Sequence, residues 1–192
     1  MAATQKIELP ALKIEQITLM LIGDSPLIVH AWSEKAKKQM LDKQMKKATK
    51  GREAKDPEAD YEACFYRTPT GAYGFPAIGV KAAMVSAARY VDAKMTVLRG
   101  AFHIDDEMLT VIGEPRPRED MVRVGLGAAD IRYRPEFPEW RIPVTIKFNT
   151  SAVSPEQIAN LLNVAGFGVG IGEWRPERNG SYGRFHVGGA DQ

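Results

Sequence analysis

The sequence has little cysteine, no long apolar run, and no excess of charge outside one block. Cys64 is the single cysteine among 192 residues, so the chain can form neither an internal disulfide nor a thiolate zinc site. The longest uncharged apolar stretch, Ile17 to Ile22, is far shorter than the roughly 20 residues that span a bilayer. The first ten residues lack the charged and apolar regions of a signal peptide. We therefore expect a cytoplasmic protein with no membrane contact and no cofactor.

The composition is that of a globular protein. Hydrophobic residues make up 44% and charged residues 26% of the chain, which excludes a disordered chain, collagen and a disulfide scaffold. A chain of this length buries roughly 70% of the surface that its unfolded form exposes, and domains commonly have about 100–200 residues. We expect residues 1–192 to form a single domain.

The positive charge is concentrated in residues 34–55. This stretch has nine basic and three acidic side chains, whereas the whole chain has a net charge of only +2. Such a block either attracts polyanions or solvates an exposed face. Ser33 fits an N-cap, and Ala36 and Met40 belong to a thin apolar stripe. The pattern predicts a basic helix over 34–50 that lies outside the core.

The remaining periodicity predicts an alternation of strands and helices. Strands are expected at 17–29 (with a turn at 23–26), 62–68, 72–75, 97–104, 109–112, 121–124, 131–133, 142–148 and 182–187, and helices at 78–93 and 155–165. Polar or proline-rich connectors are expected at 51–60, 114–120 and 134–140. Without the connectors and the basic helix, the order is β-α-β-β-α-β, an α+β fold of the ferredoxin-like (RRM-like) kind.

The segment 166–184 is the most informative for function. It holds six glycines, interleaved with arginines and aromatic residues. Open backbone, guanidinium groups and flat rings together suit a phosphate backbone and stacked bases. A flexible loop with solvated arginines is the alternative. A dinucleotide-binding loop is excluded because these glycines follow a helix rather than a strand.

Three patches resemble the RAMP superfamily, the repeat-associated proteins of CRISPR effector complexes. The first is the glycine-rich loop, with Gly170-Ile171-Gly172 and then Gly180-Ser181-Tyr182-Gly183-Arg184 leading into the last strand. The second is Phe75-Pro76, followed by Lys81 and an alanine-rich helix that ends in Arg89. The third is Ser25-Pro26-Leu27-Ile28 at the end of the first strand. The chain is most similar to the Cas7-type backbone subunit and resembles a divergent member.

The resemblance implies a ferredoxin-like palm, a basic helical insertion at 33–60 and a β-hairpin thumb at 113–141. It implies a non-enzymatic subunit that binds single-stranded RNA or DNA, a guide RNA in a CRISPR complex. Such a subunit assembles along the strand as a homo-oligomer or filament, with other effector subunits as possible partners. The predicted nucleic-acid contacts, from the basic block, the alanine-rich helix and the loop, are Lys37, Lys38, Lys43, Lys46, Lys47, Lys81, Arg89, Trp174, Arg175, Arg178, Tyr182 and Arg184.

Two other functions stay open. A RAMP-type endoribonuclease would use His30, at the end of the first strand, or Asp42 for acid–base or metal-assisted cleavage. A structural assembly protein, for example a viral one, would use the same fold for protein contacts only. The three histidines have no metal-ligand spacing. No residues around Cys64 suggest a catalytic thiol.

Overall fold

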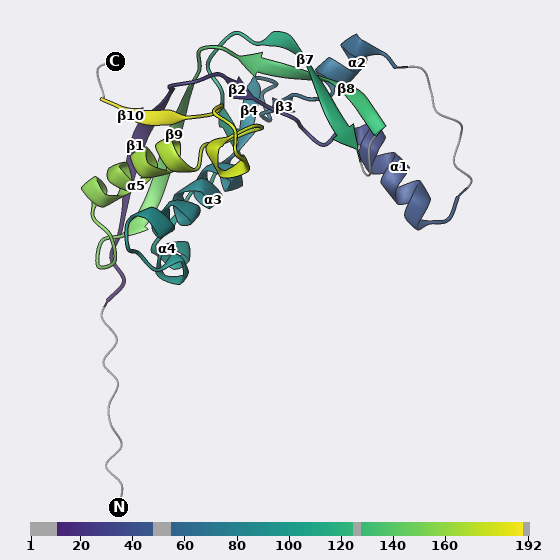
Figure 1. Ribbon diagram of the computed structural model, residues 1–192. Helices are drawn as coiled ribbons and strands as arrows, with labels where there is room; N and C mark the ends of the chain where they lie inside the picture. Colours follow the sequence, from purple (N-terminus) through teal and green to yellow (C-terminus); the bar gives the residue numbers. More distant parts are fainter. Residues whose placement is uncertain (1–10, 48–54, 125–127, 190–192) are drawn as a thin grey trace, which may run out of the picture.

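The computed structural model describes residues 11–47, 55–124 and 128–189 (Figure 1). The strands are β1 (Ile14–Gly23), β2 (Leu27–Ile28), β3 (Tyr66–Arg67), β4 (Tyr73–Pro76), β5 (Phe102–His103), β6 (Met108–Thr110), β7 (Arg116–Val124), β8 (Ala128–Phe137), β9 (Arg141–Asn149) and β10 (Phe185–Gly188). The helices are α1 (Glu34–Gln44), α2 (Pro57–Glu62), α3 (Ala77–Ala87), α4 (Met95–Ala101) and α5 (Pro155–Gly168), with single 3-10 turns η1 (Ala88–Tyr90) and η2 (Pro176–Arg178). The predicted α+β class is confirmed.

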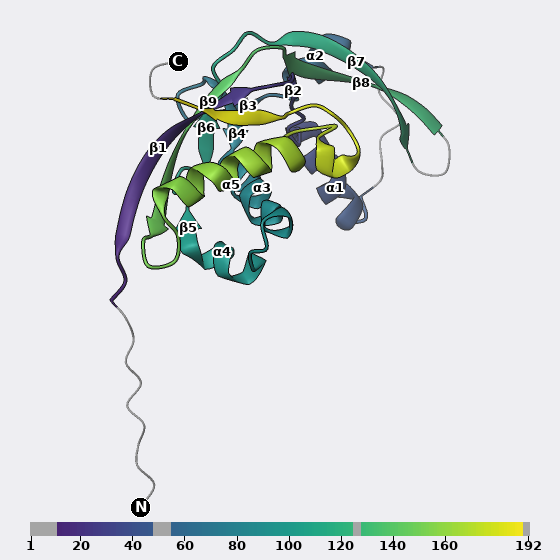
Figure 2. The same cartoon turned by 60° about the vertical axis from the view of Figure 1, so that its left-hand side comes forward.

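A four-stranded antiparallel sheet forms the centre of the molecule. Its strand order is β10-β1-β9-β5. The alternation predicted for β9 is present, because Ile142, Val144 and Ile146 are fully buried and Phe148 is 2% exposed. Helices α3 and α5 cover that face of the sheet (Figure 2). Along the chain, these elements follow one another as β1, α3, β5, β9, α5 and β10.

The central helices begin and end close to where the sequence places them. Helix α5 has the predicted capping box, in which the Ser154 hydroxyl accepts from the Gln157 N–H and the Gln157 side chain accepts from the Ser154 N–H. Helix α3 is followed by the turn η1, so the helical region runs over 77–90.

A long hairpin of β7 and β8 is inserted between β5 and β9, within the segment 113–141. The prediction of proline-rich connectors at 114–120 and 134–140 is therefore wrong. Pro117 lies opposite Pro135 in the register. The Pro135 carbonyl accepts from the Val29 N–H on the side of β8 that faces away from β7. Because the nitrogen and the carbonyl of one strand residue point to the same side, the Pro135 ring nitrogen also points away from β7. A proline in this orientation removes no hydrogen bond between the two strands.

The basic helix α1 is shorter than predicted and has no buried residue. Ser33 caps it by accepting from the Ala36 N–H at 3.2 Å. The helix ends at Gln44, and Lys46 has a left-handed backbone with φ of 53°. Residues 48–50 of the predicted helix lie outside the described residues. Figure 1 shows α1 and α2 beside the hairpin, apart from the central sheet and its helices.

Two further predictions of local structure are wrong. Residues 57–62 form α2 rather than loop and strand, because Asp56 caps the helix and Pro57 occupies its first position. Residues 95–101 form α4 rather than the start of a strand, and only 102–103 join the sheet as β5. In α4, Leu98 and Ala101 are buried in the core, and this tertiary packing outweighs the β-favouring Val97.

Packing between α5 and β10 gives a test of the fold. A Cβ atom on Gly166 would lie 1.9 Å from the Phe185 carbonyl oxygen on β10. We expect Gly166→Ala to destabilise the protein by about 1–3 kcal/mol, although helix propensity alone predicts a gain of up to about 1 kcal/mol. Gly100→Ala in α4 is the control, since nothing lies within 4 Å of its Cβ position. Urea unfolding measures both, and equal effects would contradict the packing of α5 on β10.

Candidate nucleic-acid interface

The glycine-rich loop (166–184) is held together by close backbone contacts of its own. A Cβ atom on Gly180 would lie 1.7 Å from the Trp174 carbonyl oxygen, and one on Gly183 would lie 1.8 Å from that of Ile171. Gly183 also has a positive φ of 63°. These glycines therefore serve the packing of the loop, whereas the sequence interpretation attributed them to the close approach of a ligand.

The exposed tip of this loop carries the groups that remain available to a ligand. Trp174 is 41% exposed and has a left-handed φ of 54°. The Arg178 guanidinium has no hydrogen bond or ion pair within the part of the chain that the structure describes, and its side chain is exposed. The Arg184 Nε donates only to the Ser181 carbonyl, at 3.2 Å. The predicted ligand contacts of these three residues are compatible with their positions.

Arg175 and Tyr182 instead brace the loop. The Arg175 guanidinium donates to the Gly172 carbonyl at 3.0 Å and to the Glu177 carboxylate at 3.1 Å. The Tyr182 hydroxyl accepts from Arg118 at 3.2 Å, and the Arg118 guanidinium lies 4.9 Å from the Tyr182 ring centroid. The sequence interpretation predicted a phosphate contact for Arg175 and either stacking or a bracing role for Tyr182, and the contacts within the structure fit the bracing role.

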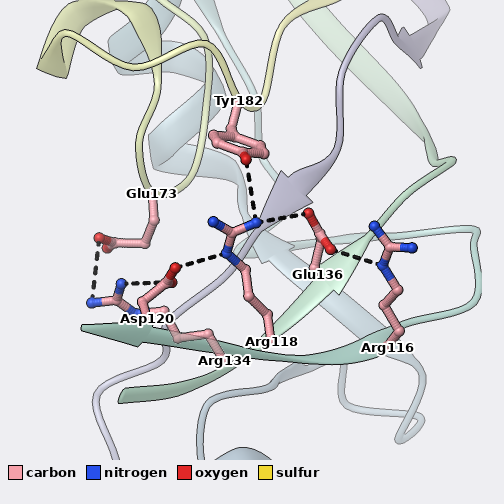
Figure 3. Close-up of polar contacts among 7 residues, drawn as sticks. All are labelled: Arg116, Arg118, Asp120, Arg134, Glu136, Glu173 and Tyr182. Carbon is pink, nitrogen blue, oxygen red and sulfur yellow. Dashed lines mark hydrogen bonds and ion pairs between the residues drawn. The ribbon is translucent and has the colours of Figure 1, made fainter. Parts of the chain in front are cut away.

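A chain of ion pairs ties the hairpin to this loop (Figure 3). Arg118 of β7 donates to Glu136 at 3.2 Å and to Asp120 at 2.8 Å. Asp120 accepts from Arg134 of β8 at 3.2 Å, and Arg134 lies 4.0 Å from Glu173 of the loop. The chain is completed at its outer end by Arg116, which donates to Glu136 at 2.8 Å.

The central members of this chain are removed from water. Asp120, Arg134 and Glu136 are 7%, 6% and 5% exposed. Charges in such a position are tolerated only when they are paired. The Arg134 Nε has no partner among the described residues. Sequence reasoning missed this arrangement because it treated 114–120 and 134–140, which contain most of these charges, as connectors.

Three cavities adjoin one another around Tyr66, which lines all of them. The helix cavity, about 720 Å³, lies between α1 and β3 and includes Trp32 and Arg67. The hairpin cavity, about 370 Å³, reaches β8 at Arg132. The loop cavity, about 320 Å³, lies between α3 and the glycine-rich loop, and His30 lines it and the hairpin cavity alike. Because they share lining residues, the three cavities lie next to one another, and we refer to them together as the trough.

The helix cavity combines aromatic and basic side chains. Its cationic residues are Lys35, Lys37 and Arg67, against two carboxylates. Trp32 is 55% exposed, and the Lys37 ammonium lies 5.7 Å from its ring centroid. Sequence reasoning singled out neither Trp32 nor Arg67. The signal for Trp32 was its position directly before the basic block, whereas Arg67 gave none.

The lysines of α1 and of the residues just after it are either paired with a carboxylate or without such a partner among the residues that the structure describes. Lys37 pairs with Glu34, and Lys47 lies 3.4 Å from Asp42. Within the described ranges, no partner is found for the exposed side chains of Lys38, Lys43 and Lys46. The structure therefore keeps α1 as an exposed cationic element at the helix-cavity end of the trough.

The two predicted nucleic-acid contacts on the alanine-rich helix, Arg89 and Lys81, lie in different surroundings. The Arg89 guanidinium lies 3.6 Å from Glu177 and so adjoins the glycine-rich loop. The Lys81 ammonium lies 3.1 Å from the His103 ring and lines a different cavity, with Asp106 and Glu107. Lys81 therefore does not line the loop cavity, because its side chain emerges on the β5 side of α3.

His30 occupies the centre of the trough as a neutral imidazole at neutral pH. Burial, and then the positive charge of Arg134, lower the pKa of His30 from its usual 6.5. Burial also raises the pKa of the Cys64 thiol, which donates to the Tyr133 carbonyl. Asp42, on α1, does not line any of the three cavities. Among the residues that the structure describes, no three His, Cys, Asp or Glu side chains converge as metal ligands.

The buried pair of Asp120 and Arg134 predicts a large effect of one substitution. Asp120→Asn leaves the Arg134 charge in a buried position with only Glu173 at 4.0 Å. We expect this variant to lose about 3–5 kcal/mol of stability. Asp106→Asn, at an exposed position, should change stability by less than about 0.5 kcal/mol. Urea unfolding of both compares them, and similar losses would show that the ion-pair chain contributes little.

Comparisons with known proteins find a similarity of structure and no match of sequence. No family model matches the sequence, and no curated protein matches it. In none of the described ranges is there a helix that combines the length and the apolar character needed to cross a membrane. The structure is similar to the crystal structure of Cmr6 from Pyrococcus furiosus, with a TM-score of 0.44 and 12% sequence identity, over 92% of this chain and 99% of that chain.

Proposed function

We propose that this protein binds single-stranded nucleic acid, RNA in the first instance, without cleaving it. The observation that carries the proposal is the trough around Tyr66, which joins exposed cations and exposed aromatic rings. A cationic groove with stacking rings is the usual arrangement for binding a single strand. Trp32 lines the helix cavity and the hairpin cavity, and Trp174 is exposed on the glycine-rich loop between Glu173 and Arg175, which line the loop cavity.

The proposal assigns a role to each part of the fold. The sheet order and its two helices fit a ferredoxin-like palm, as the RAMP resemblance implies. The hairpin β7–β8 would be the thumb, and α1 with α2 would be the basic insertion. In this proposal the chain is a Cas7-type backbone subunit that assembles along the strand, with a guide RNA and other effector subunits as partners.

The strand's phosphates would lie along α1 and the helix cavity. Lys38, Lys43 and Lys46 have no competing side-chain partner among the described residues, so a phosphate does not have to displace an ion pair. Neutralised phosphates release counterions, and this term dominates the salt dependence of binding. Trp32 would stack on a base at the same end of the trough.

Removal of the three unpaired lysines tests the phosphate contacts. We expect Lys38→Gln/Lys43→Gln/Lys46→Gln to flatten the slope of log K against log salt by about 0.7 for each lost contact. Fluorescence anisotropy with a labelled 20-nucleotide RNA measures the slope. The control removes the same charge elsewhere, at the exposed residues Lys13, Lys94 and Arg99. An equal change in both variants would reduce α1 to a solvated face.

Trp32 provides a test of stacking. Because a base stacked on an aromatic ring gains about 1–3 kcal/mol, we expect Trp32→Ala to weaken RNA binding about tenfold or more. Phe167→Ala is the control, since Phe167 is 76% exposed on α5 and lines none of the three cavities. Isothermal titration of both variants gives the affinities. Unchanged binding by Trp32→Ala would exclude the helix cavity from the interface.

One observation favours endoribonuclease activity as a second candidate. A neutral His30 in the trough can accept a proton, as a general base must. Incubation of end-labelled RNA with the protein, followed by a denaturing gel, distinguishes the two functions. Intact RNA supports a binding subunit, whereas cleavage that His30→Ala abolishes would make the protein an enzyme. A stable oligomer that binds no RNA or DNA would instead favour the assembly protein.

A further inference from the structure

The loop cavity has an excess of carboxylates, whereas the helix cavity has an excess of cations. Its ionised side chains are the carboxylates of Glu173 and Glu177 and the guanidinium of Arg175. Arg175 is already engaged by Glu177 and by the Gly172 carbonyl. A phosphate group would therefore meet more negative charge than available positive charge here. The cavity suits a neutral group that donates hydrogen bonds.

The loop cavity is lined by aromatic and aliphatic side chains. The Tyr66 and Phe75 rings meet edge to face with their centroids 6.3 Å apart, and Ile78 and Ala82 of α3 also line the cavity. Its volume of about 320 Å³ falls at the lower end of the range for small-molecule sites, about 300–1,000 Å³. A single planar ring system of the size of a nucleobase matches these dimensions.

Glu173 is the carboxylate in this cavity with hydrogen-bonding capacity to spare. Both Glu177 oxygens are engaged, one by Arg175 at 3.1 Å and the other by Arg89 at 3.6 Å. Among the described residues, the Glu173 carboxylate has Arg134 alone as a partner, at 4.0 Å from one oxygen, and its side chain is 42% exposed. Its backbone N–H donates to the Ile28 carbonyl at 2.9 Å, which fixes the residue in place.

We propose that the loop cavity takes an unstacked guanine base of the bound strand, with the Glu173 carboxylate accepting from the base edge. The inference rests on the proposed function, because a strand in the trough must deliver the base. Protein recognition of single strands commonly uses splayed bases that stack on rings and bond through their Watson–Crick edges. Guanine presents two adjacent N–H donors on that edge, which match the two oxygens of a carboxylate. Adenine, cytosine and uracil place an acceptor beside the donor, where it would repel the second oxygen.

The experiment compares oligouridine 15-mers that carry one central guanine, inosine or adenine. Inosine lacks the 2-amino group but keeps the shape of guanine. We expect wild-type protein to bind the guanine strand about tenfold more tightly than the inosine strand, within the discrimination that a bidentate base contact gives. Glu173→Gln should remove this preference and keep the binding of plain oligouridine. Glu15→Gln, an exposed charge change on β1, should leave the preference intact.

A second variant tests the cavity without touching its charges. Ala82 is exposed on α3 and lines the loop cavity, so Ala82→Phe should fill the space and abolish the guanine preference without loss of folding. Equal binding of guanine and inosine strands by the wild type would overturn the inference while leaving the proposed function in place. No binding of any oligonucleotide would overturn the proposed function itself.

Discussion

The buried ion pair between Asp120 and Arg134 is the interaction on which the candidate site depends. It holds the two strands of the hairpin through their side chains, in addition to the backbone ladder. From Arg134 the chain of charges continues to Glu173 of the glycine-rich loop. From Asp120 it continues through Arg118 to Tyr182. The hairpin and the loop are thus connected twice, so their relative position is fixed by electrostatics.

This connection explains why the trough has two ends of different character. The guanidinium groups of Arg116, Arg118 and Arg134 are engaged in holding the hairpin and the loop. The helix cavity is lined by Lys35, Lys37 and Arg67, whereas Glu173 and Glu177 line the loop cavity. A strand in the trough would therefore meet cations with its backbone at one end and carboxylates with a base at the other. Electrostatic complementarity of this kind favours one orientation of a bound strand.

In the glycine-rich loop, the residue pattern identified the right region, but the physical role of several of its residues differs from the predicted one. Glycine, arginine and aromatic residues are concentrated there, and their concentration did identify the region next to the trough. Gly180 and Gly183, however, are required by backbone contacts inside the loop. Arg175 and Tyr182 are braces, whereas Trp174 and Arg178 remain exposed. Local composition does not reveal which side chains have partners within the fold, because those partners are distant in the sequence.

The sequence by itself determined those elements whose formation depends on residues close together in the chain. The capping box at Ser154 and the alternation of 142–148 are local signals, and helix α5 and strand β9 follow them. The exposed position of α1 also followed from its thin apolar stripe. The hairpin, the chain of ion pairs and the trough required the tertiary structure. The Pro117–Pro135 pairing is acceptable because the backbone of Pro135 points away from β7, and the charges along β7 and β8 can pair only because the register brings the two strands side by side. The proline pairing and the charge pairing both depend on contacts between residues that are distant in the sequence, and no short segment encodes such contacts.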